Sequence, residues 1–179
     1  APHKSEQMSL LIDIGTNAEM ILGNRHHLMA ASSPTGPAFE GAQISAGQRA
    51  AVGAIERVRI NPDNYEPIYK VIGSNKWSDS PEFQKDVQKI GVTGICGSGI
   101  IEILAEMYLT GIISEDGVIN GALASKTKRI EKSGRTFSYR VTDHVVITQA
   151  DVRAIQLAKA ALHAGFRLLM DKMGIEKVD

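Results

Sequence analysis

Cysteine is nearly absent from this chain, and the shortage narrows the possible chemistry. Among 179 residues only Cys96 is a cysteine, so the chain cannot form an internal disulfide or a metal site built from cysteines alone. A chain without disulfides suits a reducing compartment, and we expect a cytoplasmic protein. No histidine lies near Cys96 in the sequence, which favours a small buried thiol over a catalytic nucleophile.

Net charge and long apolar runs are also lacking. Twenty basic residues balance 20 acidic ones, which argues against nucleic-acid binding driven by overall charge. No apolar run approaches the roughly 18 residues of a membrane span, and the opening APHKSEQ lacks the apolar core of a secretory signal. The length is that of one domain with a real core, so we expect residues 1–179 to form a single domain.

Glycine, in contrast, is abundant and clustered. Many of the 17 glycines fall within residues 36–47, 91–99 and 111–121. Such clusters indicate turns, or places where the backbone approaches something closely. The segment 38–50, which is rich in small residues, is either a ligand-facing loop or a plain connector.

Residues 8–24, MSLLIDIGTNAEMILGN, contain the first motif with chemical content. Apolar runs on both sides of the polar corner Gly15, Thr16 and Asn17 predict two short strands joined by a tight turn. The Asp13 carboxylate, the Thr16 hydroxyl and the amide groups of the corner suit a phosphate and its Mg²⁺ ion. The alternative is a hairpin turn in which Asp13 and Asn17 merely satisfy nearby backbone groups.

Residues 91–111, GVTGICGSGIIEILAEMYLTG, contain the second motif. Apolar residues at helical spacing predict a helix that begins near Ser98 and ends at Gly111. The preceding loop, with Gly97 and Gly99, would direct unpaired N–H groups and the helix dipole toward an anion. It matches neither the Walker loop nor the dinucleotide fingerprint. The alternative is that these glycines permit close packing of the helix.

The remaining patterns complete a mixed α/β chain. We expect a third antiparallel strand at 28–32, a strand pair at 55–60 and 68–72, a surface loop with at most one helical turn at 74–88, and a short strand at 137–141. A helix of about seven turns is predicted from Thr148 to Gly174, with Thr148 and Asp151 as a capping pair. Within it, His163 is expected to be a satisfied structural residue.

Four stretches, taken in their order and spacing, resemble a single family. They are LLIDIGTNAEM, GPAFEGAQIS, GICGSGIIEILAEM and ITQADVRAIQLAKAALHAGFRLLM. They are similar to the C-terminal region of the reductive activators of corrinoid proteins. These activators are iron–sulfur ATPases whose nucleotide-binding domain resembles acetate and sugar kinases, heat-shock chaperones and actin. The resemblance implies an α/β fold: a ribonuclease-H-like lobe with a mixed sheet, antiparallel hairpins and packed helices.

The same resemblance implies a function. Such proteins use ATP to return inactive Co(II) corrinoid proteins of methyltransferase systems to the Co(I) state. The implied phosphate-binding turn consists of Asp13, Gly15, Thr16 and Asn17, with Gly97, Ser98 and Gly99 as a neighbouring loop near the nucleotide. Asp13 would be catalytic and would bind Mg²⁺ directly or through water. The implied partners are a corrinoid protein, the remaining domains of a parent protein and, as an open possibility, a second copy.

The departures from the family pattern predict a fragment. The cysteines of the family's N-terminal 2Fe–2S domain are absent, only one DxGT turn occurs, and no Gly-Gly adenosine turn follows the last helix. We therefore expect one lobe of a two-lobed ATPase, with half an ATP site that binds nucleotide weakly or not at all by itself. The alternative is an interaction or dimerisation module that docks the corrinoid protein without binding nucleotide. A sugar or acid kinase is disfavoured because no substrate loop is recognisable.

Overall fold

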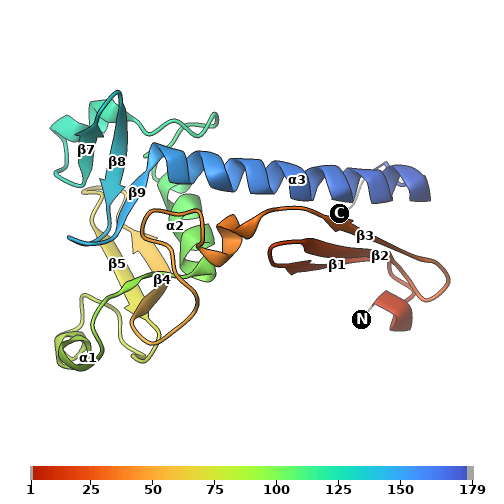
Figure 1. The fold of residues 1–179 in the computed structure, drawn as a ribbon, viewed down its shortest axis with the longest axis horizontal. Coiled ribbons are helices and arrows are strands. Elements are labelled where there is room, and N and C mark those ends of the chain that lie inside the picture. Colours follow the sequence, from red (N-terminus) through yellow and green to blue (C-terminus); the bar gives the residue numbers. More distant parts are fainter. Residues whose placement is uncertain (1, 177–179) are drawn as a thin grey trace. The chain divides into compact units, whose positions relative to one another are not determined.

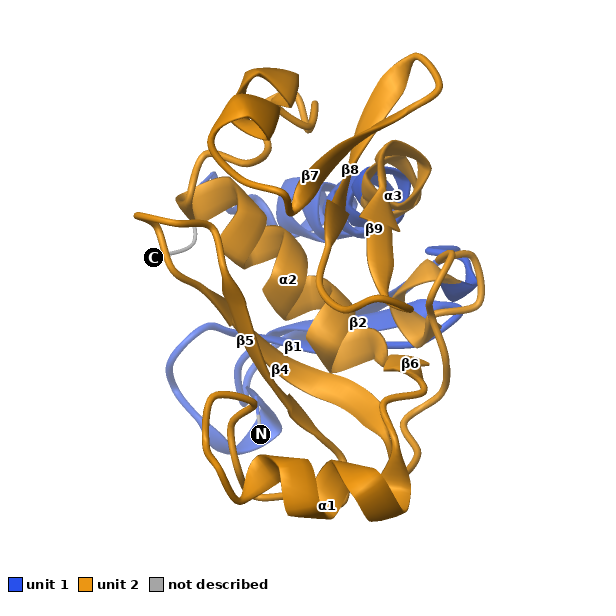
Figure 2. Cartoon of the chain, turned by 90° about the vertical axis from the view of Figure 1, so that its left-hand side faces the viewer, with its two compact units in different colours: residues 1–37, 156–179 blue, residues 38–155 orange. Residues whose placement is uncertain are grey.

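The computed structural model describes residues 2–176 and shows short strands, mostly in runs of two or three, and three α-helices within this part of the chain (Figure 1). Its contacts divide the chain into two compact units, one of residues 1–37 and 156–179 and one of residues 38–155 (Figure 2). The last helix, α3 (Gln149–Met173), contributes residues to both units. Each unit is described by itself below.

Unit 1 is built on a three-stranded antiparallel meander. Its strands are β1 (Ser9–Ile14), β2 (Ala18–Gly23) and β3 (Leu28–Ser33), in the order β1-β2-β3, preceded by the short 3-10 turn η1 (Pro2–Lys4). The predicted hairpin and the predicted third strand are both confirmed. Because β1 pairs with β2 from Ile14 opposite Ala18 outward, only Gly15, Thr16 and Asn17 remain for the turn.

The core of unit 1 follows the strand period of two. Met20 and Leu22 of β2 are fully buried and pack with Leu169 and Met170 of α3, whereas Glu19 points to solvent. The apolar face predicted for the helix is also present: Ala158 and Leu169 are buried and Leu162 packs against the same core. His163 is exposed, so its expected structural role is wrong; it lies off the apolar face of the helix.

Unit 2 contains a small mixed sheet of three strands. Strand β4 (Ala54–Ile60) pairs antiparallel with β5 (Pro67–Val71) and parallel with the two-residue β6 (Gly94–Ile95). Helix α2 (Gly97–Leu109) follows β6 directly and packs against β4. The predicted helix and strand pair are therefore confirmed, and Gly111 has the positive φ of 72° that suits a residue just past a helix end.

The surface loop expected at 74–88 is wrong in part, because it contains the helix α1 (Phe83–Ile90). The helix is amphipathic, because Phe83, Val87 and Ile90 recur at helical spacing. The many charged residues around them make this pattern hard to recognise in the sequence. Phe83 is buried and meets the ring of Tyr69 edge to face, with the ring centres 5.6 Å apart. This aromatic contact and the hydrogen bond from the Ser74 hydroxyl to Asp86 at 2.6 Å hold the helix in place.

A second antiparallel sheet completes unit 2. It consists of β7 (Ile130–Ser133), β8 (Thr136–Arg140) and β9 (Val146–Thr148), with two short 3-10 helices, η2 (Pro37–Glu40) and η3 (Gly121–Ser125), elsewhere in the chain. Helix α3 starts directly after β9. Within residues 2–176 no helix is both long enough and apolar enough to cross a membrane.

Candidate functional site

The turn between β1 and β2 is held by one hydrogen bond within the turn and by further hydrogen bonds from Thr35 and Gly36. The Gly15 N–H donates to the Asn17 carbonyl at 2.9 Å and closes the turn on itself. The hydroxyl of Thr35 donates to the carbonyl of Gly15 at 2.8 Å and lies 3.2 Å from that of Thr16. The Gly36 N–H donates to the same Thr16 carbonyl at 2.9 Å. Two successive carbonyl groups therefore point toward the segment that follows β3.

The direction of these carbonyls sets the direction of the amide groups. In a trans peptide the C=O and the following N–H point to opposite sides, and no cis peptide occurs among the described residues. With the carbonyls of Gly15 and Thr16 directed at Thr35, the amides of Thr16 and Asn17 face the other way. Two neighbouring N–H groups that face one side form a concave site of positive potential, which suits a phosphate oxygen.

Asp13 at the end of β1 does not support the turn. Its side chain is exposed, and among the described residues it has no hydrogen-bond or ion-pair partner. The side chain of Asn17 likewise makes no hydrogen bond within the described part of the chain. The interpretation in which these two side chains serve only the local backbone therefore finds no support.

A second carboxylate lies directly across the hairpin from Asp13. The register pairs Asp13 with Glu19, and Glu19 accepts a hydrogen bond from the Ser32 hydroxyl at 3.1 Å. Like charges opposite each other on a sheet repel, so a cation near this pair would relieve the repulsion. Across residues 2–176 no group of three or more His, Cys, Asp or Glu side chains could hold a metal ion without further ligands. An ion at Asp13 would thus need phosphate oxygens or water to complete its coordination.

The glycines of the second motif make close contacts with neighbouring backbone. A Cβ atom added at Gly97 would lie 2.1 Å from the Phe39 carbonyl oxygen, and one at Gly99 would lie 2.4 Å from the Ile55 carbonyl oxygen. Close packing of α2 thus explains both glycines. The N–H groups of Gly97, Ser98 and Gly99 nevertheless have no hydrogen-bond partner among the described residues, as expected at a helix start. The loop serves packing, and an anion-binding role stays a prediction.

The buried thiol expected at Cys96 is confirmed. Cys96 is 2% exposed at the N-terminal end of α2. Its Sγ donates to the Ile55 carbonyl at 3.3 Å and lies 3.3 Å from the Ser98 hydroxyl. The thiol thus links the start of α2 to β4 and offers no accessible nucleophile.

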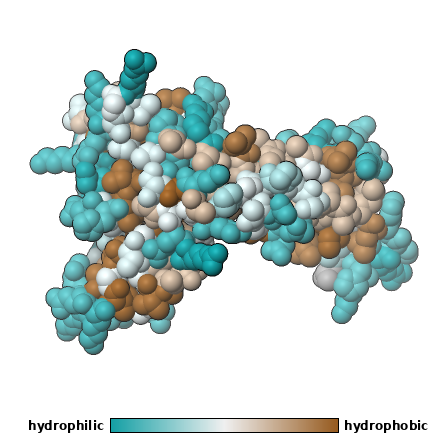
Figure 3. Space-filling model, viewed as in Figure 1, coloured by the Kyte–Doolittle hydropathy of each residue, from teal (hydrophilic) through white to brown (hydrophobic). Residues whose placement is uncertain are grey.

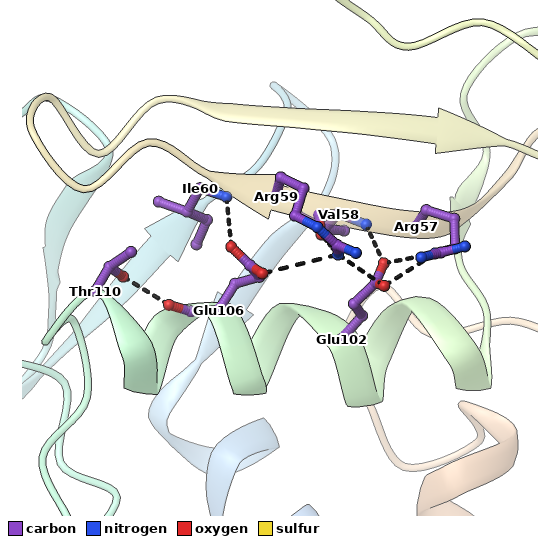
Figure 4. Close-up of polar contacts among 7 residues, drawn as sticks. All are labelled: Arg57, Val58, Arg59, Ile60, Glu102, Glu106 and Thr110. Carbon is purple, nitrogen blue, oxygen red and sulfur yellow. Dashed lines mark hydrogen bonds and ion pairs between the residues drawn. The ribbon is translucent and has the colours of Figure 1, made fainter.

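Two glutamates of α2 hold the helix against the open edge of β4 (Figure 4). Glu102 accepts the Val58 N–H at 2.7 Å, and Glu106 accepts the Ile60 N–H at 2.9 Å. The spacing matches, because four residues of a helix advance about 6 Å and two residues of a strand about 6.6 Å. Strand β6 pairs with β4 only at Ala54 and Ile55. Beyond this point the two carboxylates accept the N–H groups of β4 that a longer neighbouring strand would otherwise accept.

Arginines of β4 complete this contact. Arg57 Nε lies 2.9 Å and the Arg59 guanidinium 2.7 Å from Glu102 Oε1. Burial raises the pKa of Glu102, but the hydrogen bonds from Arg59, Val58 and Arg57 outweigh it, so the pKa is lowered overall. The carboxylate therefore stays ionised at neutral pH, and its bonds fix the position of α2 along the direction of β4.

The segment 38–50 also has a structural task. Ser45 donates its N–H at 2.8 Å and its hydroxyl at 3.0 Å to the buried Asp151. The other carboxylate oxygen of Asp151 accepts the N–H of Thr148 at 2.7 Å and its hydroxyl at 2.8 Å, which confirms the predicted capping pair. The connector interpretation of this segment is therefore supported by its contacts.

The predicted site residues fall into two groups. Asp13, Gly15, Thr16 and Asn17 come together in one turn of unit 1, whereas Gly97, Ser98 and Gly99 begin α2 in unit 2. Sequence reasoning missed Thr35, to which no sequence pattern assigned a role. It also missed Glu102 and Glu106, although their spacing of four residues on a helix was a visible signal.

Comparisons with known proteins agree with this fold. The family model described as the C-terminal domain of RACo, the ASKHA domain, matches residues 7–179. A solved structure titled reductive activator for corrinoid,iron-sulfur protein superposes with a TM-score of 0.79 at 34% identity, over 97% of this chain and 26% of that one. The chain thus has a fold of the ASKHA class, which includes actin-like folds.

Curated relatives point to the same group. The corrinoid activation enzyme RamQ of Eubacterium limosum is 34% identical over 98% of this chain and 29% of its own length. The Co(II) methylated amine-specific corrinoid protein reductase of Methanosarcina barkeri is 28% identical over 96% of this chain and 30% of its own length. The chain belongs to the family of RACo C-terminal ASKHA domains. It spans less than a third of the length of these relatives.

Proposed function

We propose that this chain supplies the phosphate-binding lobe of an ATP-dependent reductive activator, which returns corrinoid proteins from the Co(II) to the Co(I) state. One observation carries the proposal. The Asp13 carboxylate is exposed without a partner among the described residues, beside a turn whose carbonyls are held on the opposite side by Thr35. A hairpin that served only as a turn would have no need of either feature.

Each residue of the turn would have a separate task. The amides of Thr16 and Asn17 would donate to phosphate oxygens, and Gly15 would let the phosphate approach the backbone. Asp13 would hold Mg²⁺ directly or through water, with Glu19 adding negative charge across the hairpin. Bound Mg²⁺ neutralises phosphate charge and so favours phosphoryl transfer to water. Separately, in unit 2, the N–H groups at the α2 start, Gly97, Ser98 and Gly99, would give that loop a positive potential of its own.

The partners follow from the proposed reaction. Electrons would come from a 2Fe–2S cluster held by a separate domain, because the one cysteine of this chain cannot hold such a cluster. The name of one relative specifies corrinoid activation, and that of the other the reduction of a Co(II) corrinoid protein. We propose a corrinoid protein as the partner here, with ATP turnover coupled to its binding and release.

The test is the substitution Asp13→Asn in the intact gene product. Loss of the charge should reduce ATP hydrolysis by at least about a hundredfold, since it removes an electrostatic contact to the metal and phosphate. The fold should be retained, because Asp13 supports no other described group. Steady-state ATP hydrolysis and thermal unfolding measure the two effects.

The matched control is Asp63→Asn, an exposed acid in the turn between β4 and β5. It should leave both ATP turnover and the melting temperature unchanged. Unchanged turnover in Asp13→Asn would remove Asp13 from the mechanism.

The second candidate function is a docking module without nucleotide binding. It is favoured by exposed apolar side chains on α3, where Leu157 is 75% and Leu168 is 50% exposed on one helical stripe. On the face shown in Figure 3, apolar residues are mingled with hydrophilic ones. The two candidates differ in one readout: a docking module binds its corrinoid partner equally well with and without Mg²⁺ and ATP, and Asp13→Asn does not change this.

A further inference from the structure

We propose that Thr35 is the positioning residue of the phosphate-binding turn, a role that rests on the proposed function. Its hydroxyl keeps the carbonyls of Gly15 and Thr16 directed away from the phosphate side of the turn, and so presents the amides of Thr16 and Asn17 to the phosphate. Thr35 itself does not touch the ligand.

The contacts of Thr35 are those of a built support. The residue is 6% exposed, and its hydroxyl lies 2.8 Å from the Gly15 carbonyl and 3.2 Å from the Thr16 carbonyl. The neighbouring Gly36 N–H adds a third bond to the Thr16 carbonyl at 2.9 Å. A single side chain thus fixes two consecutive peptide planes from a segment some twenty residues further along the chain.

The orientation of these planes decides the sign of the turn's potential. Rotation of either peptide plane replaces an N–H on the phosphate side with a carbonyl oxygen, which repels phosphate. A glycine at position 15 offers little steric resistance to such a rotation. Without the Thr35 hydroxyl, the Gly15 carbonyl would lose its fixed partner and the Thr16 carbonyl would keep only the Gly36 N–H, so the turn would populate orientations that bind phosphate poorly.

The chain contains a matched control two residues away. Ser33 is also 6% exposed, and its hydroxyl donates at 2.7 Å to the Ala161 carbonyl of α3. In both residues a buried hydroxyl therefore donates a hydrogen bond to a backbone carbonyl within unit 1. Their bonds differ in the carbonyl that accepts: Ser33 donates to a carbonyl of helix α3, and Thr35 donates to a carbonyl of the β1–β2 turn.

The experiment compares Thr35→Val, Thr35→Ser and Ser33→Ala in the intact gene product, with affinity for Mg²⁺-ATP and melting temperature measured on each. Thr35→Val keeps the shape and loses the donor, so affinity should fall by about tenfold or more. Thr35→Ser keeps the hydroxyl and should restore affinity. Ser33→Ala should lower the melting temperature to a similar degree and leave affinity unchanged.

Each outcome has a defined meaning. If Thr35→Val binds Mg²⁺-ATP as tightly as the unaltered protein while Asp13→Asn does not, the positioning role is overturned and the proposed function stands. If neither substitution changes affinity or turnover, the proposed function itself fails. If Ser33→Ala weakens affinity as much as Thr35→Val, the effect belongs to stability and the positioning role is again overturned. Should Thr35→Val not fold, Thr35→Cys replaces it, and unchanged affinity there has the same meaning.

Discussion

At the scale of single residues, buried and exposed carboxylates of this chain differ in what holds them. Asp151 is buried and accepts hydrogen bonds from Ser45 and Thr148 on both of its oxygens. Asp13 is exposed and has no such partner among residues 2–176. A carboxylate bonded on both oxygens has a structural task, whereas one held by nothing is available to a ligand. This contrast is why Asp13, and not Asp151, enters the proposed mechanism.

Glu102 allows a residue-scale prediction about pH. Since its pKa in the folded chain lies below that of an ordinary glutamate, its stabilising effect is present above the unfolded pKa of about 4.3 and is lost as the pH falls through the folded pKa. Glu102→Gln should therefore lower the free energy of unfolding by roughly 1–3 kcal/mol at neutral pH. The difference from the unaltered chain should shrink below pH 4.

Urea unfolding at several pH values measures this effect. The control is Glu131→Gln, which removes an equally charged partner of an arginine, Arg140, on the exposed β7–β8 hairpin. Surface pairs of this kind contribute little, so the control should change stability less than Glu102→Gln. Equal losses of stability in the two variants would mean that the contact of Glu102 with the β4 edge contributes no more than a surface ion pair.

At the scale of elements, both longer helices contain a glycine that faces a neighbouring strand. A Cβ at Gly99 of α2 would lie 2.4 Å from the Ile55 carbonyl oxygen, a backbone atom that cannot move alone. A Cβ at Gly165 of α3 would lie 2.4 Å from the end methyl of Met20, the far end of a flexible side chain, and 3.1 Å from the Ser33 Cβ. A side chain at position 99 would thus collide with backbone, whereas one at position 165 would first meet a flexible side chain.

This difference predicts effects of different size for the same substitution. Gly99→Ala should destabilise by roughly 1–3 kcal/mol because α2 must shift from β4. Gly165→Ala should change stability by no more than about 1 kcal/mol, since the better helix propensity of alanine offsets the displaced methyl. Chemical denaturation of both variants decides it, and a larger loss for Gly165→Ala would contradict the packing described here.

At the scale of the whole molecule, the expected single domain stays a prediction. The chain divides into two compact units, and α3 contributes to both. A helix loses stability over its whole length when either end loses its packing, because helix formation is cooperative. We therefore expect the two units to unfold together.

The only tryptophan makes this measurable. Trp77 lies in unit 2, so its fluorescence follows that unit, whereas circular dichroism at helical wavelengths follows helices of both units. In the 179-residue chain the two urea transitions should coincide. Separate midpoints would show two independently folding units and would overturn the single-domain expectation.

Local patterns were enough to predict most elements of this protein. Apolar runs on both sides of a polar corner in residues 8–24 predicted the hairpin, and apolar spacing of three and four predicted α2 and α3, because these signals depend only on the residues of one element. The exception is α1, where charged residues are as numerous as apolar ones and the one buried side chain, Phe83, anchors the helix. Such an anchor depends on Tyr69, a distant residue that no local pattern reveals.

The sequence by itself determined the family, most of the strands and both longer helices, and the turn that contains Asp13, since these are encoded by residue types at short spacing. Only the tertiary structure decided that Thr35 lies under this turn, that Glu102 and Glu106 close the edge of β4, and that Gly97 and Gly99 serve packing. Each of these is a contact between residues twenty or more positions apart. Such contacts follow from how elements pack and not from the pattern of any one of them.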